Sequence, residues 1–221
     1  DIPETAALGI LGMPGLAAWV GLNHLAHFRA GETVAASAAG GTVGAAVIQL
    51  AAARGCRTIA ITSKDKHDYV ANELKADAVA FRDGDLADQL ARHCPDGIDV
   101  YFDNVGGEAL KAVLARLALR ARIVLCGMIS QYQSDIPPPG PNLGPVIAAR
   151  ASLHGLVVYD HFEDMEWFRS EAIPLYREDR LRCRETRFEG LESAPEAFCA
   201  LMNGDTAGRV LVAIDQQENG A

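Results

Sequence analysis

The chain has no Cys-x-x-Cys pair, and its five cysteines lie far apart in 221 residues. An odd number of widely spaced cysteines fits reduced intracellular thiols better than a disulfide framework or a structural zinc site. We therefore expect each thiol to act as a small buried hydrophobic group, and we expect no metal site. The cysteines are Cys56, Cys94, Cys126, Cys183 and Cys199.

Positive charge is also in short supply, with 20 lysines and arginines against 29 acidic residues and a net charge of −9. General nucleic-acid binding needs clustered positive charge, so this composition argues against it. No apolar run reaches membrane-spanning length, and the first residues lack the basic segment of a secretion signal. We expect a cytoplasmic protein that binds neither nucleic acid nor membrane. The hydrophobic fraction of 49% is ample for a buried core.

Strand and helix patterns alternate through the first two thirds of the chain. Largely apolar strands separated by helices are typical of parallel strands that helices cover on both faces. The sequence therefore predicts an α/β fold with a doubly wound parallel sheet of the Rossmann type. The expected strands are 33–37, 57–62, 78–81, 99–103 and 122–126, and the expected helices between them are 43–54, 66–75, 86–93 and 108–119.

The rest of the chain divides into flanking segments. We expect residues 1–30 to form a flanking helix (14–28), residues 31–183 to form the Rossmann domain, and residues 184–221 to form a C-terminal strand–helix–strand unit. The segment 134–145 holds five of the ten prolines and is predicted to be a surface loop. The remaining expected elements are helix 146–151, strand 153–158, helix 162–176, strand 184–188, helix 194–203 and strand 209–214.

A glycine-rich turn, 37–44, joins the first strand to the first helix of the sheet. Its last six residues fit the pattern A-x-G-x-x-G, with Ala39 at the first glycine position. Gly41 would let the backbone approach a pyrophosphate, and Gly44 would let the helix pack close to the sheet. The helix N-terminus would then offer free N–H groups to the phosphates. The alternative is a tight turn that binds no ligand.

The residues after the second strand distinguish the two nicotinamide dinucleotides. An NAD site usually has an acidic residue there, whereas this chain has Thr-Ser-Lys-Asp-Lys at 62–66. The hydroxyl of Ser63 and the ammonium groups of Lys64 and Lys66 suit a 2′-phosphate, and one charge-assisted contact contributes about 1.5–3 kcal/mol. The sequence predicts NADP(H), with Asp65 pointing outward, and argues against an S-adenosylmethionine methyltransferase. Either lysine could instead be a solvated residue at the start of a helix.

Four stretches together resemble one family: 11–16 (LGMPGL), the turn 37–44, 96–107 (DGIDVYFDNVGG) and 126–132 (CGMISQY). In this order and spacing they resemble the zinc-independent medium-chain reductases of the prostaglandin reductase and leukotriene B4 12-hydroxydehydrogenase group. That group includes the NADP-dependent alkenal double-bond reductases. The resemblance implies reduction of the C=C bond of α,β-unsaturated aldehydes and ketones by NADPH, without a metal.

The resemblance also assigns residues to the cofactor. Lys66 matches the lysine that pairs with the 2′-phosphate, and Asn104 would contact the cofactor near its centre. The segment after the fifth strand would line the nicotinamide side. By position, the pyrophosphate would lie on Gly41, Thr42, Val43 and Gly44, and the nicotinamide beside Cys126, Gly127 and Ile129.

Other matched positions concern the substrate and the departures from the family. Tyr132 would face the substrate pocket and is the candidate catalytic hydroxyl; the alternative is an aromatic side chain that anchors its loop. Phe81 stands where the family often has a tyrosine that helps to hold the 2′-phosphate. Thr206 stands where the family often has an asparagine that reaches the nicotinamide, and Ala148 replaces a tyrosine of animal members.

Family members carry an N-terminal, GroES-like catalytic domain that closes over the nicotinamide. This chain has no initiator methionine and is expected to begin where that domain ends. We expect it to supply the cofactor-binding domain of an enone or enal reductase, to form a homodimer, and to turn over little alone. The alternatives are a quinone oxidoreductase of the same superfamily and a non-catalytic NADP-binding or oligomerisation module.

Overall fold

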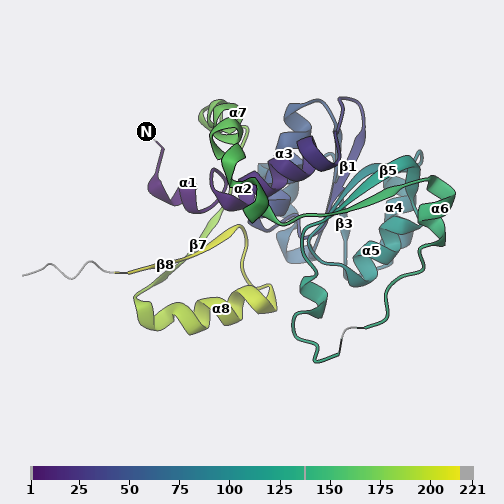
Figure 1. Ribbon diagram of the computed structural model, residues 1–221. Coiled ribbons are helices and arrows are strands. Elements are labelled where there is room, and N and C mark those ends of the chain that lie inside the picture. The colour runs from purple at the N-terminus through teal and green to yellow at the C-terminus, as the bar shows by residue number, and fades with distance from the viewer. Residues whose placement is uncertain (1, 137, 215–221) are drawn as a thin grey trace, which may run out of the picture.

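The computed structural model describes residues 2–136 and 138–214. Its centre is a six-stranded parallel sheet with the order β3-β2-β1-β4-β5-β6, so the winding reverses between β1 and β4 (Figure 1). This order confirms the predicted doubly wound α/β fold. The strands are β1 (Thr33–Ala36), β2 (Arg57–Thr62), β3 (Ala78–Phe81), β4 (Ile98–Asp103), β5 (Leu117–Leu125) and β6 (Ser152–Gly155).

Helices cover both faces of this sheet, and each face has its own hydrophobic core. Neighbouring residues of a strand point to opposite faces, so Val34 of β1 belongs to one core and Ala35 to the other. The first core contains α2 (Met13–Val20), α3 (Thr42–Ala53) and α7 (Met165–Arg177). The second contains α4 (Leu86–His93) and α5 (Gly107–Leu114).

The C-terminal part forms a second, two-stranded parallel sheet, which lies below the main sheet in Figure 1. Strand β7 (Glu185–Glu189) pairs with β8 (Arg209–Ala213), and α8 (Ala194–Asn203) connects them. The Gly208 N–H donates to the Gly40 carbonyl over 2.8 Å, which ties this unit to the glycine-rich turn. The remaining elements are α1 (Glu4–Leu8), η1 (Gly21–Leu25), η2 (Lys64–Lys66), η3 (Tyr69–Glu73), η4 (Ile129–Gln131), α6 (Gly144–Ala149), η5 (Val158–Asp164) and η6 (Leu191–Ser193).

The predicted helix 108–119 is wrong at its C-terminal end. Helix α5 stops at Leu114, and β5 already begins at Leu117, where it pairs with Ile98 of β4. The register of this pair then shifts, and Arg120 takes a left-handed φ of 62°. Pairing across the sheet thus overrides a local sequence that lacks glycine or proline as a helix stop.

Three further expectations need correction. The stretch 66–75 is a short 3₁₀ turn followed by a π-helical turn, and the helix 14–28 ends in the π-helical turn η1. Cys199 is exposed and Cys126 and Cys183 are half-buried, so only Cys56 and Cys94 are the buried thiols that we expected; all five cysteines are free. Within the described ranges, no helix is long and apolar enough to cross a membrane.

The close approach of α3 to the sheet gives a first prediction. A Cβ on Gly44 would lie 2.4 Å from the Ala38 carbonyl oxygen, so Gly44→Ala should lower the free energy of unfolding by about 1–3 kcal/mol. Urea denaturation measures this change. Gly155→Ala is the control, because a Cβ there meets nothing within 4 Å, and it should stay within about 0.5 kcal/mol of the parent. Equal stability of the two variants would contradict the tight packing.

Candidate functional site

A cavity of about 330 Å³ opens at the carboxyl ends of β1 and β2, beside the point where the winding reverses. Open α/β sheets bind ligands at this position. The glycine-rich turn, the segments after β2 and β3, and the end of α8 line the cavity. Five of the predicted site residues are among the lining: Gly41, Ser63, Lys66, Ile129 and Thr206.

The glycine-rich turn presents the start of α3. Ala38 has a left-handed φ of 48°, and Gly41 is the extended N-cap after which the helix begins at Thr42. No side chain caps this N-terminus, so the N–H groups of its first turn, including those of Thr42 and Val43, are not used by a capping side chain. Together with the helix dipole they form a site suited to an anion.

Lys66 lies half-buried at the other side of this turn. Its Nζ donates a hydrogen bond to the Gly204 carbonyl over 2.8 Å. A Cβ on Gly40 would lie only 2.7 Å from the Lys66 side chain, so this glycine gives the lysine room. Burial lowers the pKa of the Lys66 ammonium, against the neighbouring charge of Asp65, which raises it. Lys64 is exposed, and so is Asp65, as predicted.

Arg82 lines the same cavity as Lys66, and the sequence analysis missed it. Its backbone N–H donates to the Thr62 carbonyl over 2.9 Å, which holds the residue beside the end of β2. Phe81 instead packs against His67, with ring centroids 5.7 Å apart. A signal was present in the sequence, because Arg82 directly follows a predicted strand that neighbours the second one.

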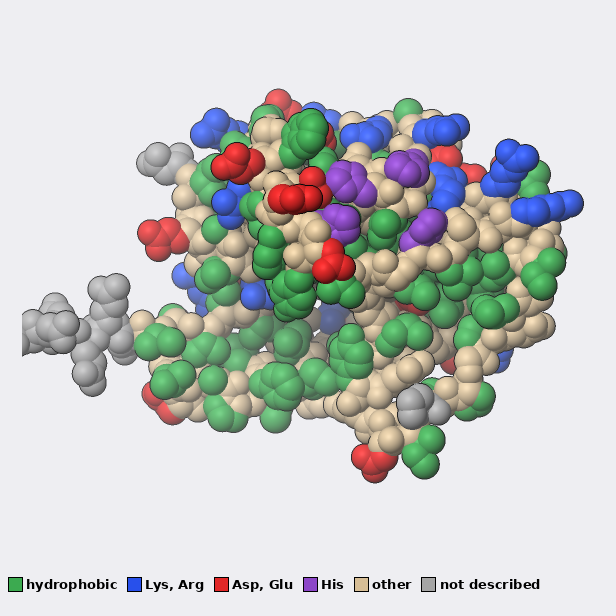
Figure 2. All heavy atoms as spheres, viewed as in Figure 1, with side chains coloured by type: hydrophobic (Ala, Val, Ile, Leu, Met, Phe, Trp, Pro, Cys, Tyr) green, Lys and Arg blue, Asp and Glu red, His purple; other side chains and the backbone are tan. Residues whose placement is uncertain are grey.

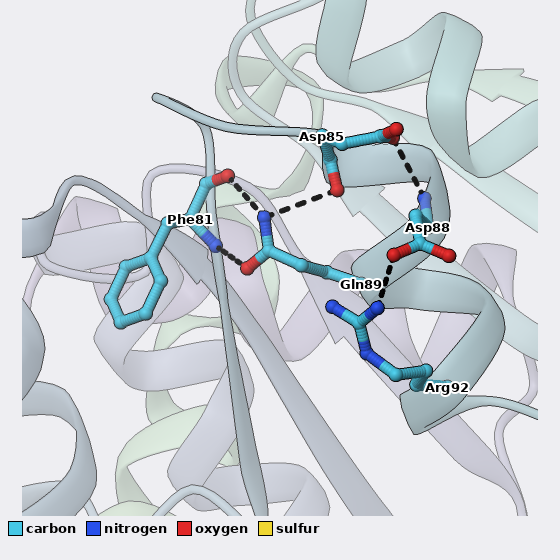
Figure 3. Close-up of polar contacts among 5 residues, drawn as sticks. All are labelled: Phe81, Asp85, Asp88, Gln89 and Arg92. Carbon is cyan, nitrogen blue, oxygen red and sulfur yellow. Dashed lines mark hydrogen bonds and ion pairs between the residues drawn. The ribbon is translucent and has the colours of Figure 1, made fainter.

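Helix α4 holds the backbone of Phe81, the residue before Arg82, through Gln89 (Figure 3). The Gln89 side chain accepts a hydrogen bond from the Phe81 N–H over 2.9 Å and donates one to the Phe81 carbonyl over 3.1 Å. Asp85 caps this helix by accepting from the Asp88 N–H over 2.9 Å. The residue before Arg82 is therefore held on both of its backbone polar groups.

A buried polar network lies beneath the glycine-rich turn and was also missed. The Asp103 Oδ1 accepts hydrogen bonds from Ser37 Oγ and Tyr101 OH, each 2.8 Å long. It also accepts from the N–H groups of Val105 and Gly106, each over 3.0 Å. Burial, followed by the nearby charge of Asp103, raises the pKa of Tyr101, so the phenol stays a hydrogen-bond donor.

Asn104 belongs to this network and does not line the cavity. Its N–H donates to Ser37 Oγ over 2.8 Å, and its Nδ2 donates to the Ser37 carbonyl over 2.9 Å. Both contacts reach the first residue of the glycine-rich turn. Within the described residues, the side chain of Asn104 is thus engaged in holding the turn.

The segment after β5 is anchored to the backbone of Asp103. The N–H groups of Cys126 and Gly127 donate to the Asp103 carbonyl over 2.9 and 3.1 Å. Burial, and then the charge of Asp103, raises the pKa of the Cys126 thiol to about 11, so the thiol is neutral near pH 7. Tyr132 is 63% exposed, and its hydroxyl accepts from the Met128 N–H over 3.3 Å. Of this segment's predicted site residues, only Ile129 lines the cavity.

Comparison with known proteins decides the family. Residues 42–173 match the family model described as zinc-binding dehydrogenase. The chain is 37% identical over 97% of its length to the NADPH-dependent curcumin reductase of Escherichia coli and 38% identical over 98% to a tobacco (Nicotiana tabacum) NADP⁺-dependent 2-alkenal reductase. The chain belongs to the alkenal and prostaglandin reductase group of the medium-chain dehydrogenase/reductases.

Solved structures of this medium-chain reductase group agree with the fold. The crystal structure of CurA from Vibrio vulnificus in complex with NADPH superposes with a TM-score of 0.91 at 34% identity. The match covers 98% of this chain and 67% of CurA. The chain spans 65% and 64% of the lengths of the two curated relatives.

The Asp103 network gives the second prediction. Asp103→Ala removes the acceptor of two buried hydroxyl groups and two backbone N–H groups, so it should cost about 2–5 kcal/mol of unfolding free energy. Tyr101→Phe removes a single donor and should cost about 1 kcal/mol. Chemical denaturation of both variants tests this order. A Tyr101→Phe variant that is less stable than Asp103→Ala would refute the central place of the carboxylate.

Proposed function

We propose that the chain is the NADPH-binding part of a reductase that acts on the C=C bond of α,β-unsaturated aldehydes and ketones. The observation that carries this proposal is the pair of cations, Lys66 and Arg82, which line one cavity together with Ser63. A carboxylate at this place would select the free ribose hydroxyls of NAD(H), whereas two cations favour a 2′-phosphate. The similar curcumin reductase is NADPH-dependent, the 2-alkenal reductase is NADP⁺-dependent, and CurA was crystallised with NADPH. These relatives support the same cofactor for this chain.

The proposed cofactor would extend across the carboxyl ends of the strands. The pyrophosphate would lie on the N-terminal turn of α3, from Gly41 to Gly44. Ile129 and Thr206 would flank the nicotinamide, and Thr206 is 8% exposed in the cavity wall. Asn104, Cys126 and Gly127 would act indirectly, because their hydrogen bonds position the backbone around the site.

When bound, NADPH would supply the hydride that adds to the β-carbon of the substrate. The developing enolate oxygen then needs a hydrogen-bond donor, and the α-carbon needs a proton. We assign the donor to Tyr132. Its oxygen already accepts the Met128 N–H, so the hydroxyl hydrogen remains for the substrate. The homodimer, the cytoplasmic location and the domain division remain predictions of the sequence.

Nucleotide binding tests the cofactor assignment. Calorimetric titration should show NADPH binding at least tenfold tighter than NADH, because each charge-assisted contact contributes about 1.5–3 kcal/mol. Lys66→Ala and Arg82→Ala should each weaken NADPH binding about tenfold or more and leave NADH binding unchanged. Lys64→Ala is the matched control and should change neither.

Two results would contradict this assignment. Equal affinity for both nucleotides would remove the 2′-phosphate site. No binding of either nucleotide would leave only a structural or oligomerisation role for the chain.

Acceptor preference tests the reaction. With NADPH, the chain should reduce an α,β-unsaturated aldehyde faster than a quinone, although slowly. Tyr132→Phe should lower the aldehyde rate roughly a hundredfold without changing the dissociation constant of NADPH. Tyr159→Phe, at another exposed tyrosine, is the control. Faster quinone reduction would favour the quinone oxidoreductase, and an unchanged rate in Tyr132→Phe would remove the hydroxyl from the mechanism.

A further inference from the structure

A second cluster of side chains, of types that bind metal ions, lies outside the cofactor cavity. His24 comes from η1, His161 from η5, and Asp164 is the N-cap of α7. One ligand atom from each of the three lies within 4.8 Å of the others. Figure 2 views a face on which several histidines lie beside acidic side chains, over the helices near α2 and α7.

We propose that His24, His161 and Asp164 form a binding site for a divalent transition-metal ion, with zinc as the best fit. The spacing of cysteines and histidines in the sequence did not indicate this set, because His24 lies 137 residues before His161. His24 also precedes the segment that matches the family model, so the complete set is not contained in that match.

The distances are longer than those of good hydrogen bonds and close to the spacing of ligands around a metal ion. Nδ1 of His24 lies 3.5 Å and Nδ1 of His161 lies 3.4 Å from the same oxygen, Oδ2 of Asp164. Good N–H···O hydrogen bonds span about 2.7–3.2 Å. Ligands bound tetrahedrally at about 2.0–2.1 Å from zinc lie about 3.3 Å from one another. The two N···O distances therefore match the spacing of zinc ligands, and all three ligand atoms lie within 4.8 Å of one another.

The conformations of two ligands support this reading. Asp164 occupies the N-cap position of α7, yet its side chain makes no capping hydrogen bond. Asp164 is in the αR region and continues η5 directly into α7, and its carboxylate lies beside the two imidazole nitrogens. His161 departs from helical geometry (φ −127°, ψ 18°) at a kink in η5. The Asp164 side chain is 17% exposed and that of His161 26%, so the site is partly shielded from water.

The ligand types decide which ion fits. Two imidazole nitrogens and one carboxylate oxygen suit zinc, nickel or copper, whereas magnesium and calcium prefer oxygen ligands. Three protein ligands leave a fourth position for water. The ion would join η1 to the start of α7. It would add to the hydrogen bond between Trp19 Nε1 and Glu171 Oε2, 3.0 Å long, which already links α2 to α7.

Calorimetric titration of the chain with zinc chloride tests the proposal. We expect saturable binding of one zinc ion per chain and no saturable binding of magnesium. His24→Ala, His161→Ala and Asp164→Asn should each weaken zinc binding at least tenfold. His93→Ala, at a histidine on α4, should leave it unchanged. Zinc binding that is absent, or equally tight in the His24→Ala/His161→Ala double variant, would overturn the proposal; the second result would point to a thiol such as Cys199.

Fluorescence provides an independent readout. The Trp19 ring lies next to His24, with centroids 5.0 Å apart, and a Trp167→Phe background leaves Trp19 as the single tryptophan. Nickel should quench its emission, and His161→Gln should abolish the quenching while circular dichroism shows a folded chain. Quenching that persists in folded His161→Gln would overturn the site. NADPH affinity should not change with zinc, because none of the three residues lines the cofactor cavity.

Discussion

The carboxylate of Asp103 joins the strand ends between which the sheet reverses its winding. A buried carboxylate is costly unless hydrogen bonds compensate for the lost water; here Oδ1 receives four of them, whereas Oδ2 has no partner among the described residues. The donors come from Ser37 after β1, from Tyr101 within β4 and from the backbone that follows β4. The Asp103 carbonyl adds the two N–H groups that begin the segment after β5. The ends of β1, β4 and β5 are therefore held in fixed positions relative to one another, and the same hydrogen bonds fix the start of the glycine-rich turn.

The cavity depends on this geometry and on the return of the C-terminal unit. The N–H of Gly208 and the carbonyl of Gly204 hydrogen-bond to the turn and to Lys66 respectively. These contacts hold the end of α8 against the cavity, although α8 connects the two strands of the second sheet. In the proposed complex, the Lys66 ammonium would exchange the Gly204 carbonyl for a phosphate. The donor is thus already oriented toward the cavity, and less of the binding free energy is lost in ordering it.

Most of the fold could be predicted because its signals are local. The bounds of β2, β3, α4 and α8 agree with those expected from apolar patterns and turn residues. The largest error, in the helix predicted for 108–119, came where a local pattern was ambiguous. The stretch 117–119 is rich in leucine and alanine and continues the helical spacing. In the structure, however, Leu117 pairs with Ile98, so this stretch belongs to β5. A contact between residues distant in sequence cannot be read from a single window of residues.

The same distinction separates the site residues. Gly41 and Lys66 could be found because the turn and the second strand are contiguous patterns with known ligand chemistry. In our proposal, Arg82 contacts the 2′-phosphate because β3, which it follows, lies next to β2. That neighbourhood depends on the strand order, which the sequence does not show directly. Phe81 alone would predict a weak preference for NADP(H), since the tyrosine hydroxyl is missing. In the proposed complex, the cation one residue later would replace the lost contact with a full charge, because a guanidinium binds phosphate oxygens more strongly than a neutral phenol does. The departure at Phe81 therefore argues for a relocated phosphate contact and not for a change of cofactor.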